Sequence, residues 1–451
     1  MNLNAYLNKR IPCSCGKEHF CAVKAVDIEE GALKRIPGYI KDYGFSNVYM
    51  IADPNTWKAA GEETARLLRE AGIHFEVLVF EEEEPVPDER AIGRIFTTLP
   101  EGTDLLLGIG GGSINDLCKY VSYKLGLQCM LAATAPSMDG FVSEGAALIL
   151  NHMKVTENAH SPVAVAGDLN VLTKAPMKLI AAGLGDTLGK YTCLLDWKIA
   201  HILNGEYYCR ETAEMAETSL KAVRELALSG KVEQRDPEAI RSLTEALVMT
   251  GIAMAFAGNS RPASGCEHHM SHYWEMKAFL SGMFPALHGA QVGAGEVLTV
   301  KLYHMLAKEQ PDFDALKERP FDKAAWEQMI RTNYTQAADG ILALEEKAGK
   351  NDLSGRNRRL DAMKENWPEI CRLIDTELPS ADEMISLLKA CDAPVSVKEL
   401  GFPQAWVRET VLCAKEVRDR YTMLQMLWDL GLSEKYADYA DEFEEELSRN
   451  I

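Results

Sequence analysis

The most constraining feature of this sequence is a change in its expected secondary structure near residue 172. Before that point, short apolar segments rich in β-branched and aromatic residues alternate with helix-like stretches. The expected strands are residues 45–51, 74–79, 104–109, 129–133 and 164–172, and the helix-like stretches between them include 55–71 and 87–97. Strands that alternate with helices of this length predict βαβ units and a parallel sheet.

After residue 172 the sequence has long helix-like stretches and few strand signals. The expected helices are residues 175–200, 211–228, 237–257, 270–280, 290–307 and 405–444. A chain of 451 residues is also too long for one ordinary core. We therefore expect an α/β N-terminal domain with a parallel sheet, residues 1–172, and an all-helical C-terminal domain, residues 173–451. Residues 351–361 (NDLSGRNRRLD) are expected to form an exposed loop, and 312–400 contain no motif that we can interpret.

The charge balance excludes one class of partner. The chain has 48 basic and 67 acidic residues, which gives a net charge of −19. A protein whose main partner is DNA or RNA needs a basic face, so we expect no nucleic-acid partner. An anionic ligand must instead be bound by local positive features.

The N-terminal segment, the lack of a long apolar run and the cysteines indicate a cytoplasmic protein. The N-terminal segment has no apolar signal core, and we find no run of about 20 apolar residues that would span a membrane. The 11 cysteines show no disulfide-domain spacing, so we expect reduced thiols. Cys13 and Cys15, with His19 nearby, resemble half of a metal clip, but a second ligand pair is missing, and we predict no structural zinc there.

A glycine-rich turn follows the apolar strand at 104–109. The segment Gly110-Gly111-Gly112-Ser113 precedes a helix-like stretch, with Ser113 as the expected N-cap. Backbone N–H groups at a helix start can bind a pyrophosphate, although a tight turn without any ligand fits equally well. The segment is neither GxGxxG nor a P-loop. Asp53, after the first strand, fits either a ribose hydroxyl or a cap of the next helix.

Ligand-type side chains gather in three segments of the second half. Asp186 lies in GLGDTLGK, His268 and His272 in EHHMSH, and His288 in LHG. His268 and His272 are four residues apart, which places them on one face of a helix. One carboxylate and two imidazoles suit a catalytic divalent metal that keeps positions open for substrate. The alternative is a helix with ordinary surface or core histidines.

These segments resemble one known superfamily: iron-containing alcohol dehydrogenases, glycerol dehydrogenases and dehydroquinate synthases. The matching segments are GIGGGSIND, TAPSMDGFVS, AAGLGDTLGKY, NSRPASGCEHHMSHYWEM, LHGAQVG and RDRYTMLQMLWDLGL. The resemblance implies a metal-dependent, NAD(P)-linked enzyme that reversibly reduces dihydroxyacetone phosphate to sn-glycerol 1-phosphate. It also implies a nucleotide-binding first domain, an active site in the cleft between the domains, and a homodimer.

The resemblance also assigns roles to single residues. Asp186, His268 and His288 match metal ligands. His272 and Asp139 match catalytic residues that contact the substrate, as does Asp186. The positions that match the cofactor site are Asp53, Gly110, Gly111, Gly112, Ser113, Ile114, Thr134, Ser137 and Ser143. For the substrate phosphate no residue matches, and Arg261 and Lys190 are candidates because each lies beside a metal segment.

Several alternatives stay open. A glycerol or polyol dehydrogenase has the same expected ligands. A sugar-phosphate cyclase would place a glutamate where this chain has Asp186 and a Gly-Gly-Lys stretch after the cofactor loop, which is not found here. A non-catalytic protein on this fold would not need the intact ligand set. The ligands fit zinc, nickel or ferrous iron, and Asp53 favours NAD over NADP only if its carboxylate reaches the ribose.

Overall fold

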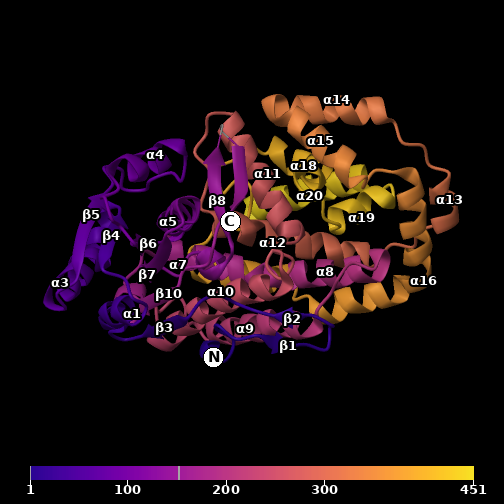
Figure 1. Ribbon diagram of the computed structural model, residues 1–451. Helices are drawn as coiled ribbons and strands as arrows, with labels where there is room; N and C mark the ends of the chain where they lie inside the picture. The colour runs from indigo at the N-terminus through magenta and orange to yellow at the C-terminus, as the bar shows by residue number, and fades with distance from the viewer. Residues whose placement is uncertain (1, 151–152, 451) are drawn as a thin grey trace. The chain divides into compact units, whose positions relative to one another are not determined.

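The computed structural model describes residues 2–150 and 153–450. Contacts divide the chain into two compact units, one of Met1–Thr187 with Glu211–Ser260 and one of Leu188–Arg210 with Arg261–Ile451. Residues 188–210, which belong to the second unit, therefore interrupt the first unit in the sequence. The predicted boundary at residue 172 stays a prediction, and the two units are described separately below (Figure 1).

The first unit is built on a six-stranded sheet in which every pair of neighbours is parallel. Its strands, in spatial order, are β3 (Ala25–Glu29), β10 (Ala164–Asp168), β7 (Gln128–Ala133), β6 (Leu105–Gly110), β4 (Asn47–Ala52) and β5 (His74–Val79). The predicted parallel α/β sheet is confirmed. The sequence missed β3, which is a short edge strand.

Alternate residues of the central strands face opposite layers of helices. Val48 and Met50 of β4 pack with α1 (Ile36–Asp42) and α3 (Glu62–Glu70). Tyr49 and Ile51 pack with α4 (Glu89–Thr98) and α5 (Gly112–Leu125) on the other face. Since both faces are covered, these strands read as continuous apolar runs rather than alternating ones.

The remaining elements of the first unit are short strands and further helices. The strands form two hairpins, β1 (Ile11–Pro12) with β2 (Glu18–His19) and β8 (Gly145–Leu150) with β9 (Met153–Asn158). The helical elements are the 3₁₀ turns η1 (Leu3–Ala5), η2 (Ala32–Arg35) and η4 (Gly140–Val142), the π-helical η3 (Trp57–Gly61), and the helices α2 (Pro54–Thr56), α6 (Leu169–Leu172), α7 (Met177–Leu188), α9 (Arg210–Leu228) and α10 (Pro237–Ala257). The sequence predicted neither hairpin.

Helix α10 is long and apolar enough to cross a membrane by length and composition alone, which our sequence expectation did not anticipate. However, 72% of its apolar window is buried within the protein. It also packs on α6, β3 and η4 of the same unit. This burial is that of a core helix.

The order of the strands defines where a ligand of the first unit would bind. β4 has β5 on one side and β6 on the other. Successive strands are therefore added to the sheet in one direction as far as β5 and in the opposite direction from β6 onward. Asp53 follows β4, and Gly111 follows β6. In open α/β sheets, ligands bind at the carboxyl ends of the strands at such a switch point. The sheet therefore brings two of the predicted cofactor positions to that edge.

Within the described residues of the second unit, all regular elements are helices. This unit contains α8 (Lys190–Asn204), α11 (Cys266–Leu280), α12 (His288–Leu306), α13 (Phe313–Lys317), α14 (Lys323–Tyr334), α15 (Ala338–Ala348), α16 (Leu353–Glu377), α17 (Ala381–Ala390), α18 (Ala405–Cys413), α19 (Met423–Asp429) and α20 (Ser433–Asn450). The all-helical character of this region confirms the expectation from the sequence.

The predicted loop at 351–361 is wrong. Asp352 caps α16 by accepting a hydrogen bond from the Gly355 amide at 2.8 Å, and the segment continues as helix. Arg359 is buried in an ion pair with Asp429 at 2.7 Å. The polar, glycine-containing sequence resembles a loop because its helical partners lie about seventy residues further along the chain.

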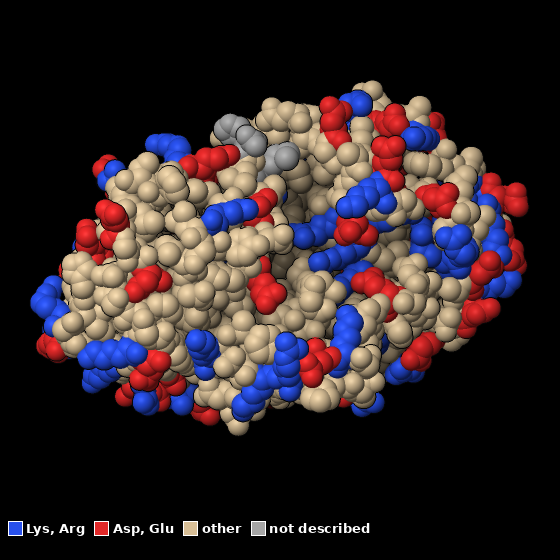
Figure 2. Space-filling view, in the orientation of Figure 1, with Lys and Arg blue, Asp and Glu red and all other residues tan. Residues whose placement is uncertain are grey.

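Charged side chains of both signs are mixed on the surface. Figure 2 shows Lys and Arg interspersed with Asp and Glu over the visible face. The expectation that the protein has no nucleic-acid partner rests on the net charge of −19 and stays a prediction.

Candidate metal centre and cofactor loop

Three imidazoles of the second unit converge. The ring centroids of His268 and His288 are 5.2 Å apart, those of His272 and His288 5.5 Å, and those of His268 and His272 6.0 Å. His268 and His272 lie on one face of α11, as their spacing predicted, and His288 is the first residue of α12. The cluster is therefore made by the start of one helix and the start of the next.

The partners of His268 and His288 orient their rings. Nδ1 of His268 lies 2.7 Å from Oε1 of Glu267, and Nδ1 of His288 lies 3.3 Å from Oγ of Ser271. An imidazole whose Nδ1 is held by a carboxylate or hydroxyl offers its Nε2 to a metal, and such partners fix the ring orientation. Both histidines thus have the arrangement found around catalytic metals.

Glu267 is itself held firmly in place. Its side chain is fully buried and accepts hydrogen bonds from Oγ1 of Thr192 at 2.8 Å and from the Gly265 amide at 2.9 Å. Asp196 also accepts a hydrogen bond from the Cys266 amide at 2.6 Å. Burial raises the pKa of the Asp196 carboxyl to about 7. The first turn of α11 is therefore anchored to α8.

Close packing of two helices brings the histidines together. A Cβ added at Gly295 of α12 would lie 2.8 Å from the carbonyl oxygen of Glu267 on α11. Only glycine fits at this position without a shift of backbone atoms. The separation of His268 and His288 thus depends on Gly295, which lies seven residues after His288.

His272 has different partners. Nε2 of His272 lies 3.3 Å from a guanidinium nitrogen of Arg418, and its Nδ1 lies 3.8 Å from Oε2 of Glu275. Because a guanidinium only donates, Nε2 accepts in this contact and the ring proton is on Nδ1. The third histidine of the cluster therefore has a cation at Nε2 and a carboxylate near Nδ1.

The neighbouring His269 is not part of the cluster. Its side chain is fully buried, and within the described residues neither ring nitrogen has a hydrogen-bond partner. Burial, together with Lys350, Arg418, Arg420 and Arg261, holds its pKa well below the ordinary value. It is a neutral core histidine beside a group of cations.

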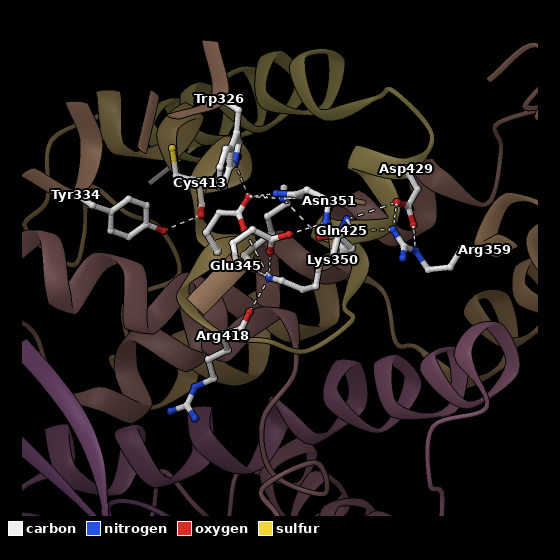
Figure 3. A network of polar contacts seen from close by, with 12 residues as sticks. Trp326, Tyr334, Glu345, Lys350, Asn351, Arg359, Cys413, Arg418, Gln425 and Asp429 are labelled. Atoms are coloured by element: carbon white, nitrogen blue, oxygen red, sulfur yellow. Dashed lines mark hydrogen bonds and ion pairs between the residues drawn. The ribbon is translucent and has the colours of Figure 1, made fainter. Parts of the chain in front are cut away.

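A buried polar network fixes the loop that carries Arg418 (Figure 3). Nζ of Lys350 donates to the backbone carbonyls of Lys415 at 2.6 Å and Arg418 at 2.7 Å. Lys415 also pairs with Glu416, and Asn351 donates to the same carboxylate at 3.2 Å. Residues 345–351 and 413–418 thus act together to hold the backbone at Arg418. No local sequence pattern indicated this network, because its partners are about sixty-five residues apart.

The two phosphate candidates named from the sequence have structural partners. Arg261 is buried and donates to Glu206 through Nε at 2.6 Å and through a terminal nitrogen at 2.5 Å. Lys190 is buried and donates to the carbonyl of Ala263 at 3.1 Å. These contacts favour a structural role for both side chains.

In the first unit, Asp186 and Asp139 lie together. Asp186, in the last turn of α7, accepts a hydrogen bond from the Asp139 amide at 2.9 Å, and both side chains are buried. A Cβ at Gly183, one turn earlier, would collide with the backbone carbonyl of Pro136. The helix and the segment that carries Asp139 therefore approach closely enough for this contact.

The glycine loop differs from the prediction in one respect. Gly111, not Ser113, is the N-cap of α5, and no side chain caps this helix. A Cβ at Gly110 would lie 2.6 Å from Cβ of Ile114, so the turn from β6 into α5 requires glycine there. Without a side-chain cap, the first N–H groups of α5 are available to an anion.

Of the other predicted cofactor positions, Thr134 and Ser137 lie beside this loop, whereas Ser143 has other partners. The Thr134 amide donates to the Gly110 carbonyl at 3.2 Å, and a Cβ at Gly111 would lie 3.4 Å from Oγ of Ser137. Oγ of Ser143 instead bonds within its own turn and accepts from Lys119 at 3.2 Å. Ser143 thus supports the loop after β7.

Lys119 is a residue that sequence reasoning missed. Its buried Nζ donates to the carbonyls of Gly140 at 2.7 Å and Gly145 at 2.6 Å. It therefore ties α5 to η4 and β8. The sequence signal that could have identified this buried lysine is its place on the apolar face of a predicted helix.

Asp53 caps the helix that follows it. Its Oδ1 accepts the amides of Asn55 and Thr56, both at 2.9 Å, and Thr56 completes a capping box. Burial raises the pKa of the Asp53 carboxyl. Of the two roles left open by the sequence, the cap is present, and a contact with a ribose stays a prediction.

The metal-dependent dehydrogenase class that this fold and site suggest agrees with the comparisons. Residues 27–176 match the family model described as iron-containing alcohol dehydrogenase. Among solved structures, glycerol dehydrogenase from Schizosaccharomyces pombe superposes with a TM-score of 0.59 at 16% identity, covering 96% of this chain and 93% of that one. The iron-containing alcohol dehydrogenase from Thermococcus thioreducens also gives 0.59, at 17% identity over 94% and 99% of the two chains.

Curated relatives are more similar in sequence. A protein of Halalkalibacterium halodurans named glycerol-1-phosphate dehydrogenase (NAD(P)+) is 39% identical over 92% of this chain and 95% of its own length. One of the same name from Bacillus licheniformis is 31% identical over 96% of both chains. The chain therefore belongs to the glycerol-1-phosphate dehydrogenase family, within the iron-containing alcohol dehydrogenases.

Proposed function

We propose that this protein is an NAD(P)H- and metal-dependent enzyme that reversibly reduces dihydroxyacetone phosphate to sn-glycerol 1-phosphate. The observation that carries the proposal is the cluster of His268, His272 and His288, in which two Nδ1 atoms are already engaged and an arginine adjoins the third ring. The names of the relatives support the same substrate.

Asp186, His268 and His288 would hold the metal ion. One carboxylate and two imidazoles suit zinc or nickel, and also ferrous iron. When bound, the ion supplies a Lewis acid for the substrate carbonyl. Glu267 and Ser271 keep the two imidazoles in the orientation that presents Nε2.

Gly110 to Ile114 would bind the pyrophosphate of the cofactor. The uncapped first turn of α5 supplies N–H donors and a partial positive charge. Asp53, Thr134, Ser137 and Ser143 would line the rest of the cofactor site, as the family resemblance implies. The nicotinamide supplies the hydride.

Arg418 is our candidate for the substrate phosphate, in place of Arg261 and Lys190. Its guanidinium contacts His272, so it adjoins the proposed metal centre, and the network around Lys350 holds its backbone. Arg420, two residues later, places a second guanidinium on the same loop. A planar guanidinium suits bidentate contact with phosphate.

His272 and Asp139 would act on the substrate. In the present arrangement Nε2 of His272 accepts from Arg418, so it can receive a proton only after Arg418 has turned to another acceptor. A phosphate bound to Arg418 would be that acceptor. We propose that substrate binding thereby frees His272 to hold and transfer a proton at the substrate oxygen.

The test compares phosphorylated and plain ketones. We expect the metal-loaded protein to consume NADH or NADPH with dihydroxyacetone phosphate, and far more slowly with dihydroxyacetone. Equal use of both would favour the polyol dehydrogenase. Turnover of a sugar phosphate without net change in the cofactor would favour the cyclase. A protein that binds neither metal nor cofactor would exclude catalysis of either kind.

We further propose a homodimer and a cytoplasmic location, as the family resemblance implies. Light scattering of the purified protein tests the first, and a mass of one chain, about 50.0 kDa, would contradict it.

A further inference from the structure

The N-terminal hairpin of the first unit forms a tight turn between two cysteines. Gly16, at φ 84°, closes the turn, and its amide donates to the Cys13 carbonyl at 3.1 Å. The Cys15 amide donates to Sγ of Cys13 at 3.5 Å. Amide hydrogen bonds to a cysteine sulfur favour the thiolate, which is the form that binds metals.

His19 of β2 completes a group of ligand atoms. Its ring is buried, and Nδ1 lies 2.8 Å from the carbonyl oxygen of Phe256 on α10. The ring also stacks on Phe256 at 5.1 Å with an interplanar angle of 6°. Because a carbonyl only accepts, Nδ1 carries the proton and Nε2 is the unprotonated, metal-binding nitrogen.

Nε2 of His19 faces the cysteines. It lies 3.5 Å from Sγ of Cys15, and the ligand atoms of Cys13, Cys15 and His19 all lie within 4.8 Å of one another. We propose that these three residues bind a structural zinc ion, separate from the metal of the active site. Two thiolates and an imidazole are the donor set that zinc prefers in structural sites.

The fourth ligand is inferred from the contact of this turn with Glu211. Oγ of Ser14, between the two cysteines, donates to Glu211 at 2.8 Å. Cys209 stands two residues before Glu211 in the sequence. Closed structural zinc sites have four protein ligands, so we include Cys209 in the proposal.

The sequence alone argued against this site because no second ligand pair follows the first. The fold changes that balance, since Phe256 of α10 fixes both the position and the tautomer of His19. When bound, the ion would close the turn between β1 and β2, and the contacts of His19 with Phe256 would link that turn to α10 of the same unit.

The experiment measures metal content in a protein whose active-site metal has been removed by mutation. We prepare His288→Ala, load it with cobalt(II) or zinc, remove excess metal, and determine metal per chain together with the near-ultraviolet spectrum. We expect one metal ion to remain per chain, and the cobalt form to show thiolate-to-cobalt charge transfer. The active-site ligands include no thiolate, so this band reports on the hairpin alone.

Further variants assign the ligands. In the His288→Ala background, Cys15→Ser and Cys209→Ser should each lose the charge-transfer band or reduce it strongly, whereas Cys371→Ser, which removes a half-buried cysteine outside the hairpin, should leave it unchanged. A His288→Ala protein without bound metal and without the band would overturn the proposal, even if every cysteine variant failed to fold. An unchanged band in Cys209→Ser would contradict the fourth ligand.

Discussion

At both His268 and His288, Nδ1 is already engaged by a neighbouring side chain. Glu267 is a charged partner and Ser271 a neutral one, so the two imidazoles differ in basicity. A carboxylate partner raises the basicity of a ligating imidazole. At the residue scale, His268 is therefore the stronger of the two proposed imidazole ligands.

Replacing the cluster histidines should separate their roles. We expect His268→Ala to lose bound metal and more than about 100-fold of turnover, because ligands contribute more than their outer partners do. His272→Ala should keep the metal while turnover falls. Metal analysis and steady-state kinetics measure both, with His304→Ala, a histidine of α12 bound to a backbone carbonyl, as the control. Equal metal loss in His268→Ala and His272→Ala would mean that the ligand was misassigned.

Arg418 gives a second prediction at the same scale. A charged hydrogen bond contributes about 1.5–3 kcal/mol, so Arg418→Ala should raise KM for dihydroxyacetone phosphate by roughly 10- to 100-fold. Activity with unphosphorylated dihydroxyacetone should not fall, because this substrate has no phosphate contact to lose and Nε2 of His272 no longer accepts from Arg418. Arg331→Ala, which removes an exposed arginine paired with Asp339, is the matched control. An equal loss with both substrates would argue against phosphate binding by Arg418.

At the scale of elements, the crossing of α11 and α12 sets the geometry of the histidine cluster. Gly295→Ala would press a methyl group against the backbone of Glu267, and such overpacking costs about 1–3 kcal/mol. We expect lower stability and weaker metal binding, measured by urea unfolding and metal titration. Gly340→Ala on α15, where a Cβ meets no atom, should be neutral or stabilising. Equal effects of the two substitutions would contradict this account of the packing.

The loop that carries Arg418 depends on a buried carboxylate. Burial opposes ionisation of Glu416, but Lys415, Lys350 and Trp326 outweigh it and lower the pKa of Glu416 to about 2. A carboxyl whose folded pKa lies below its unfolded value stabilises the fold above the unfolded pKa, and this stability is lost as the pH falls toward the folded pKa.

The resulting pH dependence can be measured. Between pH 7 and pH 3 the wild-type protein should lose about 2 kcal/mol through Glu416 alone. Glu416→Gln should lack this part of the acid dependence. Urea unfolding across this pH range compares the two proteins, and identical slopes would mean that Glu416 does not have a lowered pKa.

The sequence predicted elements well where their signals are local. The strands after residue 45 and the face shared by His268 and His272 follow from periodicity within one element. The cap at Gly111, the helix at 351–361 and the role of Arg418 depend on partners that are distant or on backbone geometry. Periodicity carries no information on such partners, so these features had to come from the structure.

At the scale of the whole molecule, an acidic protein is proposed to bind two anionic ligands. The net charge of −19 would oppose both, so binding must rest on local groups. The start of α5 in the first unit and Arg418 in the second are such groups. Activity should therefore depend on these positions rather than on the overall charge.

The most direct test of the central claim is the configuration of the product. Metal-stripped protein is reconstituted with zinc, nickel or ferrous iron, supplied with NADH or NADPH and dihydroxyacetone phosphate, and the product is resolved by chiral analysis. We predict metal-dependent cofactor oxidation with equimolar formation of sn-glycerol 1-phosphate. Formation of sn-glycerol 3-phosphate, or no cofactor oxidation with any of the three metals, would contradict the account.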